Sequence, residues 1–321
     1  MNNMNFFDDK KRIILIAVSV IIFIMVIVLL WIFWKNNENK KLEENAGVVT
    51  KTEKNYFKDI SGELEAKSAF VFDAKTGEIL FQKNAETQLP LASLTKLMTV
   101  LVSSELVSKD TVITIRQEDL NIEGDNGLLV GENLKFKNVS DMTLTASSND
   151  GAHALASVIG YIRLKDGEKT EREMFIDEMN KKAKEIGLAQ TFFLNESGLD
   201  ESDLVSGAYG SAKDMAFLMN HIIKNNYKLI EATKYPVLRI SSDNKNHLFE
   251  NTNQFVENIP GIIGSKTGFT DLAGGNLVVV FDVGIGHPII VSVLGSSKEG
   301  RFDDVIKLVN SSINQIAGIE E

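Results

Sequence analysis

The chain has 321 residues, carries a net charge of −10 at pH 7 and contains no cysteine. The excess of acidic side chains argues against a nucleic-acid partner, and the lack of cysteine excludes disulfides and thiolate chemistry. The four histidines are scattered and form no ligand-spaced pair, so we expect no metal and no cofactor.

The first part of the sequence is not typical of a globular domain. Residues 13–34 carry no charge and are rich in Ile, Val, Leu, Phe and Trp, and such a helix can cross a hydrocarbon core of roughly 30 Å. We predict a cytoplasmic tail over 1–12, a transmembrane signal anchor over 13–34 and a polar linker over 35–59. A cleavable signal peptide is the alternative, but no small-x-small cleavage site follows the apolar run.

The remaining residues, 60–321, are long enough for one large domain. A hairpin is predicted at 68–81 and an apolar helix at 91–106. Further elements follow in the order strand 111–115, loop 123–132, helix 152–162, helix 170–187, a helix capped by Ser211, strands 276–283 and 288–294, and a helix from Phe302. Strands at both ends with helices between them predict an α+β fold, with one antiparallel sheet and a mainly helical region.

Three short motifs carry the candidate chemistry, and the first is Ser93-Leu-Thr-Lys96. Positions i and i+3 of a helix share a face, so the Ser93 hydroxyl and the Lys96 amine can meet. A lysine with its ordinary pKa is protonated at pH 7, but burial and a second cation would lower that pKa until the amine could act as a base. Ser242-Asp-Asn-Lys245 has the same spacing without a helical pattern. A helix cap beside a solvent-directed lysine is the alternative for Ser93 and Lys96.

The second motif is Ser147-Ser-Asn149, at a turn that enters a helix. In this position Ser147 could pass a proton between Lys96 and a leaving group, and Asn149 could hydrogen-bond a substrate amide. Ser and Asn are also favoured as simple helix caps, and that alternative stays open for this motif alone.

The third motif is Lys266-Thr-Gly268. Lys266 and Thr267 could bind a substrate carboxylate through charge-assisted hydrogen bonds, and Gly268 would let a substrate backbone approach closely. The backbone N–H groups of Ser93 and Phe269 could together form an oxyanion hole. For this motif alone, a surface turn is the alternative.

With these motifs in this order, the sequence resembles the serine-type D-alanyl-D-alanine carboxypeptidases, which are low-molecular-mass penicillin-binding proteins of the S11 peptidase type. The resemblance covers roughly residues 65–312, and its matching segments are Leu91–Thr99, Ser147–Asp150, Asn251–Asn253 and Gly264–Thr270. It implies a serine β-lactamase/transpeptidase-like fold, in which a five-stranded antiparallel sheet is flanked by helices and joined to a helical lobe.

The resemblance also implies a reaction and a location. Ser93 would attack the D-Ala-D-Ala bond of a peptidoglycan stem peptide, with Lys96 and Ser147 as catalytic partners, and water would hydrolyse the resulting acyl-enzyme. β-Lactams would acylate Ser93 as covalent inhibitors. The catalytic domain, 60–321, would lie on the extracytoplasmic side of the cell membrane, held by the single N-terminal helix.

Three alternatives remain beside the carboxypeptidase. A DD-endopeptidase that cuts D-Ala cross-links would use the same site. A class A β-lactamase needs a glutamate in Glu-x-x-Leu-Asn, and this sequence has Thr191 at that position before Leu194-Asn195. A tethered binding protein without chemistry is the third, although both lysines and both serines of the motifs are present.

Overall fold

The computed structural model describes residues 25–31, 35, 57, 59–124, 127–163 and 169–319. The chain divides into two units, Met1–Asn55 and Tyr56–Glu321. In the first unit, residues 25–31 are helical. Within the described ranges no helix is both long and apolar enough to cross a bilayer, and the predicted anchor lies mostly outside those ranges. The predicted tail and most of the predicted linker also lie outside them.

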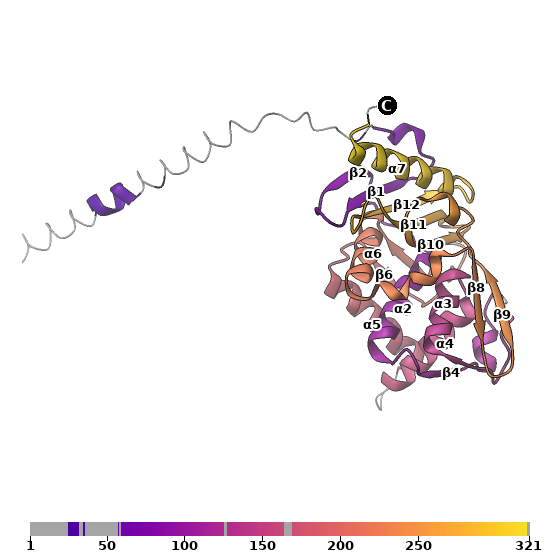
Figure 1. Ribbon diagram of the computed structural model, residues 1–321. Helices are drawn as coiled ribbons and strands as arrows, with labels where there is room; N and C mark the ends of the chain where they lie inside the picture. Colours follow the sequence, from indigo (N-terminus) through magenta and orange to yellow (C-terminus); the bar gives the residue numbers. More distant parts are fainter. Residues whose placement is uncertain are drawn as a thin grey trace, which may run out of the picture. The chain divides into compact units, whose positions relative to one another are not determined.

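A five-stranded antiparallel sheet forms the centre of the second unit (Figure 1), as predicted. The strands are β10 (Ile262–Thr270), β11 (Gly274–Asp282), β12 (Pro288–Ser296), β1 (Ser68–Asp73) and β2 (Ile79–Lys83), in that spatial order. β1 pairs with β12, with Ser68 opposite Leu294 and Asp73 opposite Ile289. This pairing joins the two ends of the domain in one sheet.

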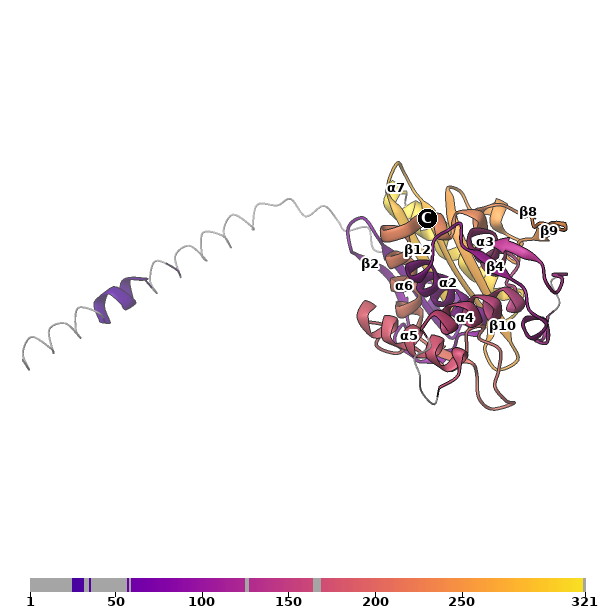
Figure 2. The same ribbon diagram turned by 90° about the horizontal axis from the view of Figure 1, so that it is seen from below.

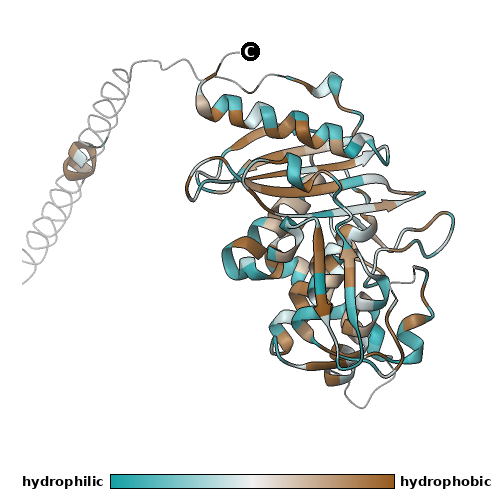
Figure 3. Cartoon of the chain, turned by 45° about the vertical axis from the view of Figure 1, so that its right-hand side comes forward, coloured by the Kyte–Doolittle hydropathy of each residue, from teal (hydrophilic) through white to brown (hydrophobic). Residues whose placement is uncertain are grey.

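Both faces of the sheet are buried, because apolar side chains alternate between two cores. On β11, Val278 and Val280 belong to the core on the side of the helical lobe, whereas Leu277 and Val279 belong to the opposite core. The opposite core is covered by α7 (Gly300–Ala317), whose apolar side faces the strands in Figure 3. The C-terminal helix predicted from Phe302 is thus the outer layer of the fold.

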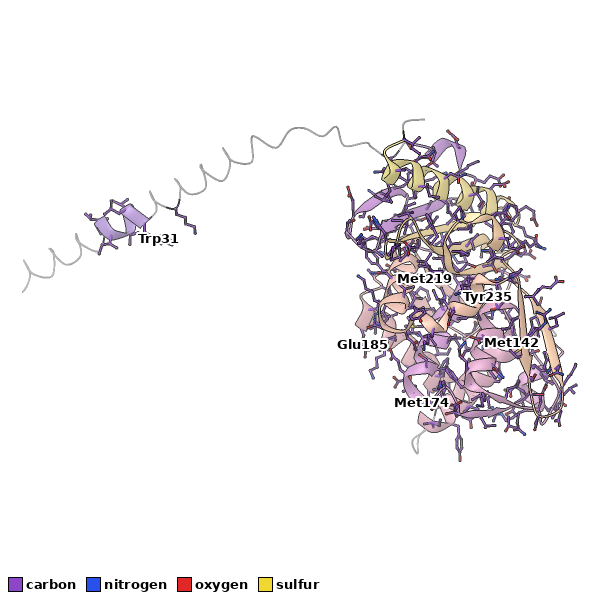
Figure 4. The ribbon with its side chains drawn as sticks, viewed as in Figure 1. Trp31, Met142, Met174, Glu185, Met219 and Tyr235 are labelled. Carbon is purple, nitrogen blue, oxygen red and sulfur yellow. The ribbon has the colours of Figure 1, made fainter. Side chains whose placement is uncertain are left out.

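The helical lobe comes from the middle of the sequence and lies on the other face of the sheet (Figure 2). Its helices are α2 (Lys96–Leu106), α3 (Phe136–Thr145), α4 (Asn149–Arg163), α5 (Glu171–Ile186) and α6 (Ala212–Asn226). The predicted capping box of Thr170 and Glu173 opens α5, which ends at the left-handed Gly187. Met142 of α3 and Met219 of α6, labelled in Figure 4, are fully buried.

Short strand pairs complete the second unit. They are β3 (Leu89–Pro90) and β6 (Phe192–Phe193) on either side of β7 (Ala208–Gly210), β4 (Val112–Thr114) with β5 (Asn133–Lys135), and β8 (Val237–Ser241) with β9 (Asn246–Glu250). Neither α3 nor the β8–β9 hairpin was predicted. On β9 only two of five residues are buried. Its alternation of apolar and polar side chains is therefore too short to indicate a strand in the sequence.

The predicted helix over 91–106 is two elements. Ala92–Thr95 forms a 3-10 turn, η2, and α2 begins only at Lys96. Ala92 has a φ of 47°, which is costly for a residue with a Cβ atom. Ser93 therefore projects from a tight, strained turn ahead of the helix.

Asn276 of β11 ties the sheet to the start of this turn. Its Nδ2 donates to the carbonyls of Pro90 and Leu91, each at 3.0 Å, and its Oδ1 accepts from the N–H of Gly295 at 2.8 Å. The side chain is fully buried. Without it, the three backbone groups would have no water molecule as an alternative hydrogen-bond partner.

We therefore expect Asn276→Ala to lower the free energy of unfolding by roughly 2–4 kcal/mol, because several buried polar groups lose their partner at once. Urea denaturation measures the change. Asn310→Ala, on the exposed side of α7, is the matched control and should change stability by less than about 0.5 kcal/mol. Equal losses in the two variants would contradict the bracing role of Asn276.

Candidate active site

Ser93 and Lys96 form a hydrogen-bonded pair. Lys96 Nζ donates to Ser93 Oγ at 2.7 Å and to the carbonyl of Ser197 at 2.8 Å. The expected i, i+3 contact is present even though Ser93 lies in a 3-10 turn, because such a turn also places i and i+3 on one side. Lys96 is fully buried, so the alternative of a solvent-directed lysine does not hold.

The burial of Lys96 changes its acid–base chemistry. Loss of water around the ammonium group lowers the pKa of Lys96 to about 7, although the negative charge of Glu196 acts in the opposite direction. A substantial fraction of the amine is therefore neutral near pH 7. A neutral Lys96 at this distance can take the proton of the Ser93 hydroxyl.

Lys266 and Ser147 form a second pair of the same kind. Lys266 Nζ donates to Ser147 Oγ at 2.8 Å and to the carbonyl of Thr267 at 2.7 Å. Burial, followed by the charges of Lys96 and Arg301, holds the pKa of Lys266 well below its usual value. The backbone of Ser147 is left-handed, with a φ of 61°. Its hydroxyl is thus held by Lys266.

Asn149 and Thr267 line the same region. Asn149 is the first residue of α4, and its Nδ2 donates to the carbonyl of Glu123 at 2.6 Å. Its buried Oδ1 has no hydrogen-bond partner within the described part of the chain. Thr267 Oγ1 lies 2.6 Å from Thr252 Oγ1.

Gly268 has a packing role that was not predicted from the sequence. A Cβ atom at this position would lie 2.9 Å from the carbonyl oxygen of Leu91 and 3.2 Å from the nitrogens of Ser93 and Leu94. The missing side chain therefore lets β10 approach the η2 turn. The role of Gly268 in substrate approach stays a prediction.

The strand geometry also favours the expected pair of oxyanion donors. The N–H of Ser265 donates to Thr233 Oγ1, on the side of β10 away from β11. N–H directions alternate along a strand, so the N–H of Phe269 points to that same side. This side is the open edge of β10, and the neighbouring Gly268 packs close to the Ser93 nitrogen. The N–H of Phe269 thus points away from β11, as an oxyanion donor requires.

Two charged residues of this region were missed by the sequence motifs. Arg301, buried at the start of α7, donates through Nη1 to the carbonyl of Gly268 at 2.8 Å. Glu196 is buried beside Ser197, the residue that holds Lys96. Neither belongs to a motif, and no local pattern marks a single arginine or glutamate as part of a site formed by distant segments.

Comparison with known proteins agrees with this geometry. The family model of the D-alanyl-D-alanine carboxypeptidases (Peptidase_S11) matches residues 50–298, which include all three motifs. The D-alanyl-D-alanine carboxypeptidase DacF of Bacillus subtilis (strain 168) is 32% identical over 258 residues, which are 78% of this chain and 63% of that protein. The chain thus spans less than two thirds of that relative's length.

Solved structures share the fold. The ampicillin-bound penicillin-binding protein D2 of Listeria monocytogenes is 31% identical, with a TM-score of 0.65 over 77% of this chain and 97% of that chain. The D-alanyl-D-alanine carboxypeptidase DacD of Francisella tularensis is 27% identical, with a TM-score of 0.71 over 84% of this chain and 74% of that chain. Because the family match covers most of the sequence and every motif residue, the chain belongs to the D-alanyl-D-alanine carboxypeptidase family, Peptidase_S11.

Proposed function

We propose that this protein is a serine DD-peptidase that removes the terminal D-alanine from peptidoglycan stem peptides. The observation that carries the proposal is the presence of two buried lysine–serine pairs in one site, Lys96 with Ser93 and Lys266 with Ser147. The two lysines are close enough for the charge of Lys96 to lower the pKa of Lys266. Such a site can activate a serine without histidine, cysteine or metal.

Acylation begins with proton transfer from the Ser93 hydroxyl to the neutral amine of Lys96. Ser93 Oγ then forms a bond to the carbonyl carbon of the D-Ala-D-Ala peptide bond, and the carbonyl oxygen becomes an oxyanion. The N–H groups of Ser93 and Phe269 receive that oxyanion. In other serine hydrolases, loss of one such donor costs roughly 2.7–4 kcal/mol of transition-state stabilisation.

The second half of acylation requires a proton on the leaving nitrogen. Ser147, held by Lys266 at 2.8 Å, passes on the proton that Lys96 has taken, and the C–N bond breaks. D-Alanine leaves with its new amino group, and Ser93 carries the acyl chain as an ester. Water then hydrolyses the ester and restores the Ser93 hydroxyl.

Substrate binding uses the charges around β10. Arg301 gives this side of the site the positive charge that a terminal carboxylate requires, Lys266 adds to it when protonated, and the Thr267 hydroxyl adds a hydrogen-bond donor. Asn149, the first residue of α4, would hydrogen-bond an amide of the stem peptide. These contacts favour a substrate with a free carboxylate beside the scissile bond, as a terminal D-alanine has.

β-Lactams fit the same site as covalent inhibitors, because their strained amide offers Ser93 the same kind of carbonyl. Thr191 stands where a class A β-lactamase would need its glutamate, and its hydroxyl donates to Asp214 at 2.8 Å. That position has no carboxylate to activate a water molecule. We therefore propose slow release of the penicilloyl group.

The proposal predicts that the purified full chain releases D-alanine from a stem pentapeptide and binds a fluorescent penicillin covalently, and that Ser93→Ala does neither. D-alanine release and gel fluorescence measure the two activities. Ser242→Ala is the matched control, since Ser242 also precedes a lysine by three residues but bonds Glu132 near the β8–β9 turn; it should keep both activities. Product from a cross-linked dimer but not from the pentapeptide would instead establish an endopeptidase.

The pKa of Lys96 predicts the pH dependence of acylation. Only the neutral amine accepts the Ser93 proton, so the acylation rate should fall as pH drops through about 7. Lys96→Ala should lower the rate by roughly 10²–10⁴-fold above pH 7, where the wild-type amine is neutral, and by less as the pH falls. Stopped-flow acylation with a chromogenic cephalosporin gives both results. A rate in the variant equal to that of the wild type would refute Lys96 as the base.

We further propose that residues 13–34 anchor the protein in the cell membrane, with residues 60–321 on the extracytoplasmic side where peptidoglycan lies. The support is the uncharged apolar sequence itself. In carbonate extraction of cells that produce the full chain, the protein should stay with the membrane pellet. Val20→Arg with Phe23→Arg should move it to the soluble fraction, because charges at the centre of a span are costly. Recovery of the unaltered chain in the soluble fraction would contradict the anchor.

A further inference from the structure

A buried cluster of charged side chains lies beside the proposed base and belongs to none of the three motifs. Its centre is the carboxylate of Glu196, which is only 1% exposed. Oε1 of Glu196 lies 2.8 Å from His153 Nδ1 of α4, and Oε2 accepts from Arg172 Nε of α5 at 2.8 Å. The carboxylate thus joins two helices of the lobe.

The backbone of the same segment holds the helix that carries the base. The carbonyl of Glu196 accepts from Thr99 Oγ1 at 2.6 Å, and the next carbonyl, that of Ser197, accepts from Lys96 Nζ at 2.8 Å. Thr99 and Lys96 lie three residues apart on α2. The consecutive carbonyls of Glu196 and Ser197 therefore accept hydrogen bonds from one side of α2, at the residue proposed as the catalytic base and one turn after it.

The turn that follows is equally restrained. Asn195 Oδ1 accepts from the N–H groups of Ser197, at 3.2 Å, and Gly198, at 2.6 Å. A Cβ atom on Gly198 would lie 1.9 Å from the carbonyl oxygen of Ala92, so this turn packs directly on the strained residue before Ser93. The position of the Glu196 side chain is thereby coupled to the geometry of both Ser93 and Lys96.

Burying a carboxylate costs desolvation free energy, and an apolar side chain of similar size would often pack equally well at the same position. Burial acts to raise the pKa of Glu196, but the hydrogen bonds and charges of His153 and Arg172 outweigh it and lower that pKa to about 2. Glu196 is therefore an anion throughout the pH range in which Lys96 titrates. A permanent negative charge beside a buried ammonium group stabilises the protonated form of that group.

We propose that Glu196 is a positioning residue for the base: its carboxylate, clamped by His153 and Arg172, fixes the Ser197 carbonyl on Lys96 and sets by its charge the pH range in which Lys96 accepts a proton. This inference rests on the proposed DD-peptidase function and adds to it a control over the activity of the base. Glu196 touches no reacting atom and acts only through Lys96 and its carbonyl anchor.

Other charged groups lie next to the residues of this cluster and contribute to the electrostatics around Glu196. Glu201 lies 3.7 Å from Arg172 and accepts from Asn195 Nδ2 at 2.6 Å. Asp119 of the 3-10 turn Gln117–Leu120 is buried near His153, and burial raises the pKa of Asp119 although Arg116 and His153 act in the opposite direction. Of all these groups, Glu196 is the one whose charge raises the pKa of Lys96.

The test is the pH profile of acylation by a chromogenic cephalosporin, measured on the full chain and its variants. Glu196→Gln keeps the shape of the side chain and removes its charge, so the acid limb of the profile should move to lower pH by on the order of one unit. Arg172→Gln removes the cation that offsets Glu196, so the limb should move to higher pH. Glu185→Gln makes the same chemical change on the exposed surface of α5 (Figure 4) and should leave the profile in place.

The outcomes separate positioning by charge from simple structural support. Opposite shifts in the Glu196 and Arg172 variants establish the inference. A uniform loss of rate without a shift, or a Glu196→Gln profile that coincides with the wild type, overturns it and leaves the peptidase function intact. A wild type that is not acylated at Ser93 overturns both. If Glu196→Gln does not fold, Arg172→Gln decides alone, because the Arg172 side chain is 47% exposed and its loss is more easily tolerated.

Discussion

The removal of water from two lysine side chains is the constraint on which the chemistry of this protein depends. Lys96 and Lys266 are both buried, and each is placed beside a serine hydroxyl at hydrogen-bond distance. In water either amine would be an inert cation at pH 7. Enclosure by sheet and lobe turns Lys96 into a base, and burial together with the charges of Lys96 and Arg301 lowers the pKa of Lys266.

Enclosure of this kind requires close contact between two parts of the fold that come from distant stretches of sequence. The edge strand β10 meets the η2 turn at Gly268, where no side chain would fit. Gly198 meets the same turn from another side, at the carbonyl of Ala92. The left-handed backbone of Ala92 and Ser147 is tolerated because the surrounding contacts leave it no alternative. Strain is thus concentrated at the residues that present the two serine hydroxyls.

The charged side chains around the site differ in sign between β10 and the surroundings of Lys96. Arg301 supplies positive charge along β10, where a carboxylate would bind, whereas Glu196 places one negative charge near Lys96. Near pH 7 a substantial fraction of Lys96 is therefore neutral and can act as a base, while the remaining fraction stays protonated. His153 and Arg172 make this possible, because without them the carboxylate of Glu196 would be too costly to bury.

The sequence by itself determined the α+β architecture and the residues of the three motifs, because caps, apolar periodicity and motif spacing are local properties. The Thr170 capping box, the Gly187 helix end and the pairing of the two chain ends in one sheet were all predictable on these grounds. Only the tertiary structure decided that Ser147 bonds Lys266 across 119 residues, that Gly268 packs against the backbone of the η2 turn, and that Glu196 and Arg301 join the site. These relations depend on burial and on contacts between segments far apart in the chain, and neither leaves a periodic signal in the sequence.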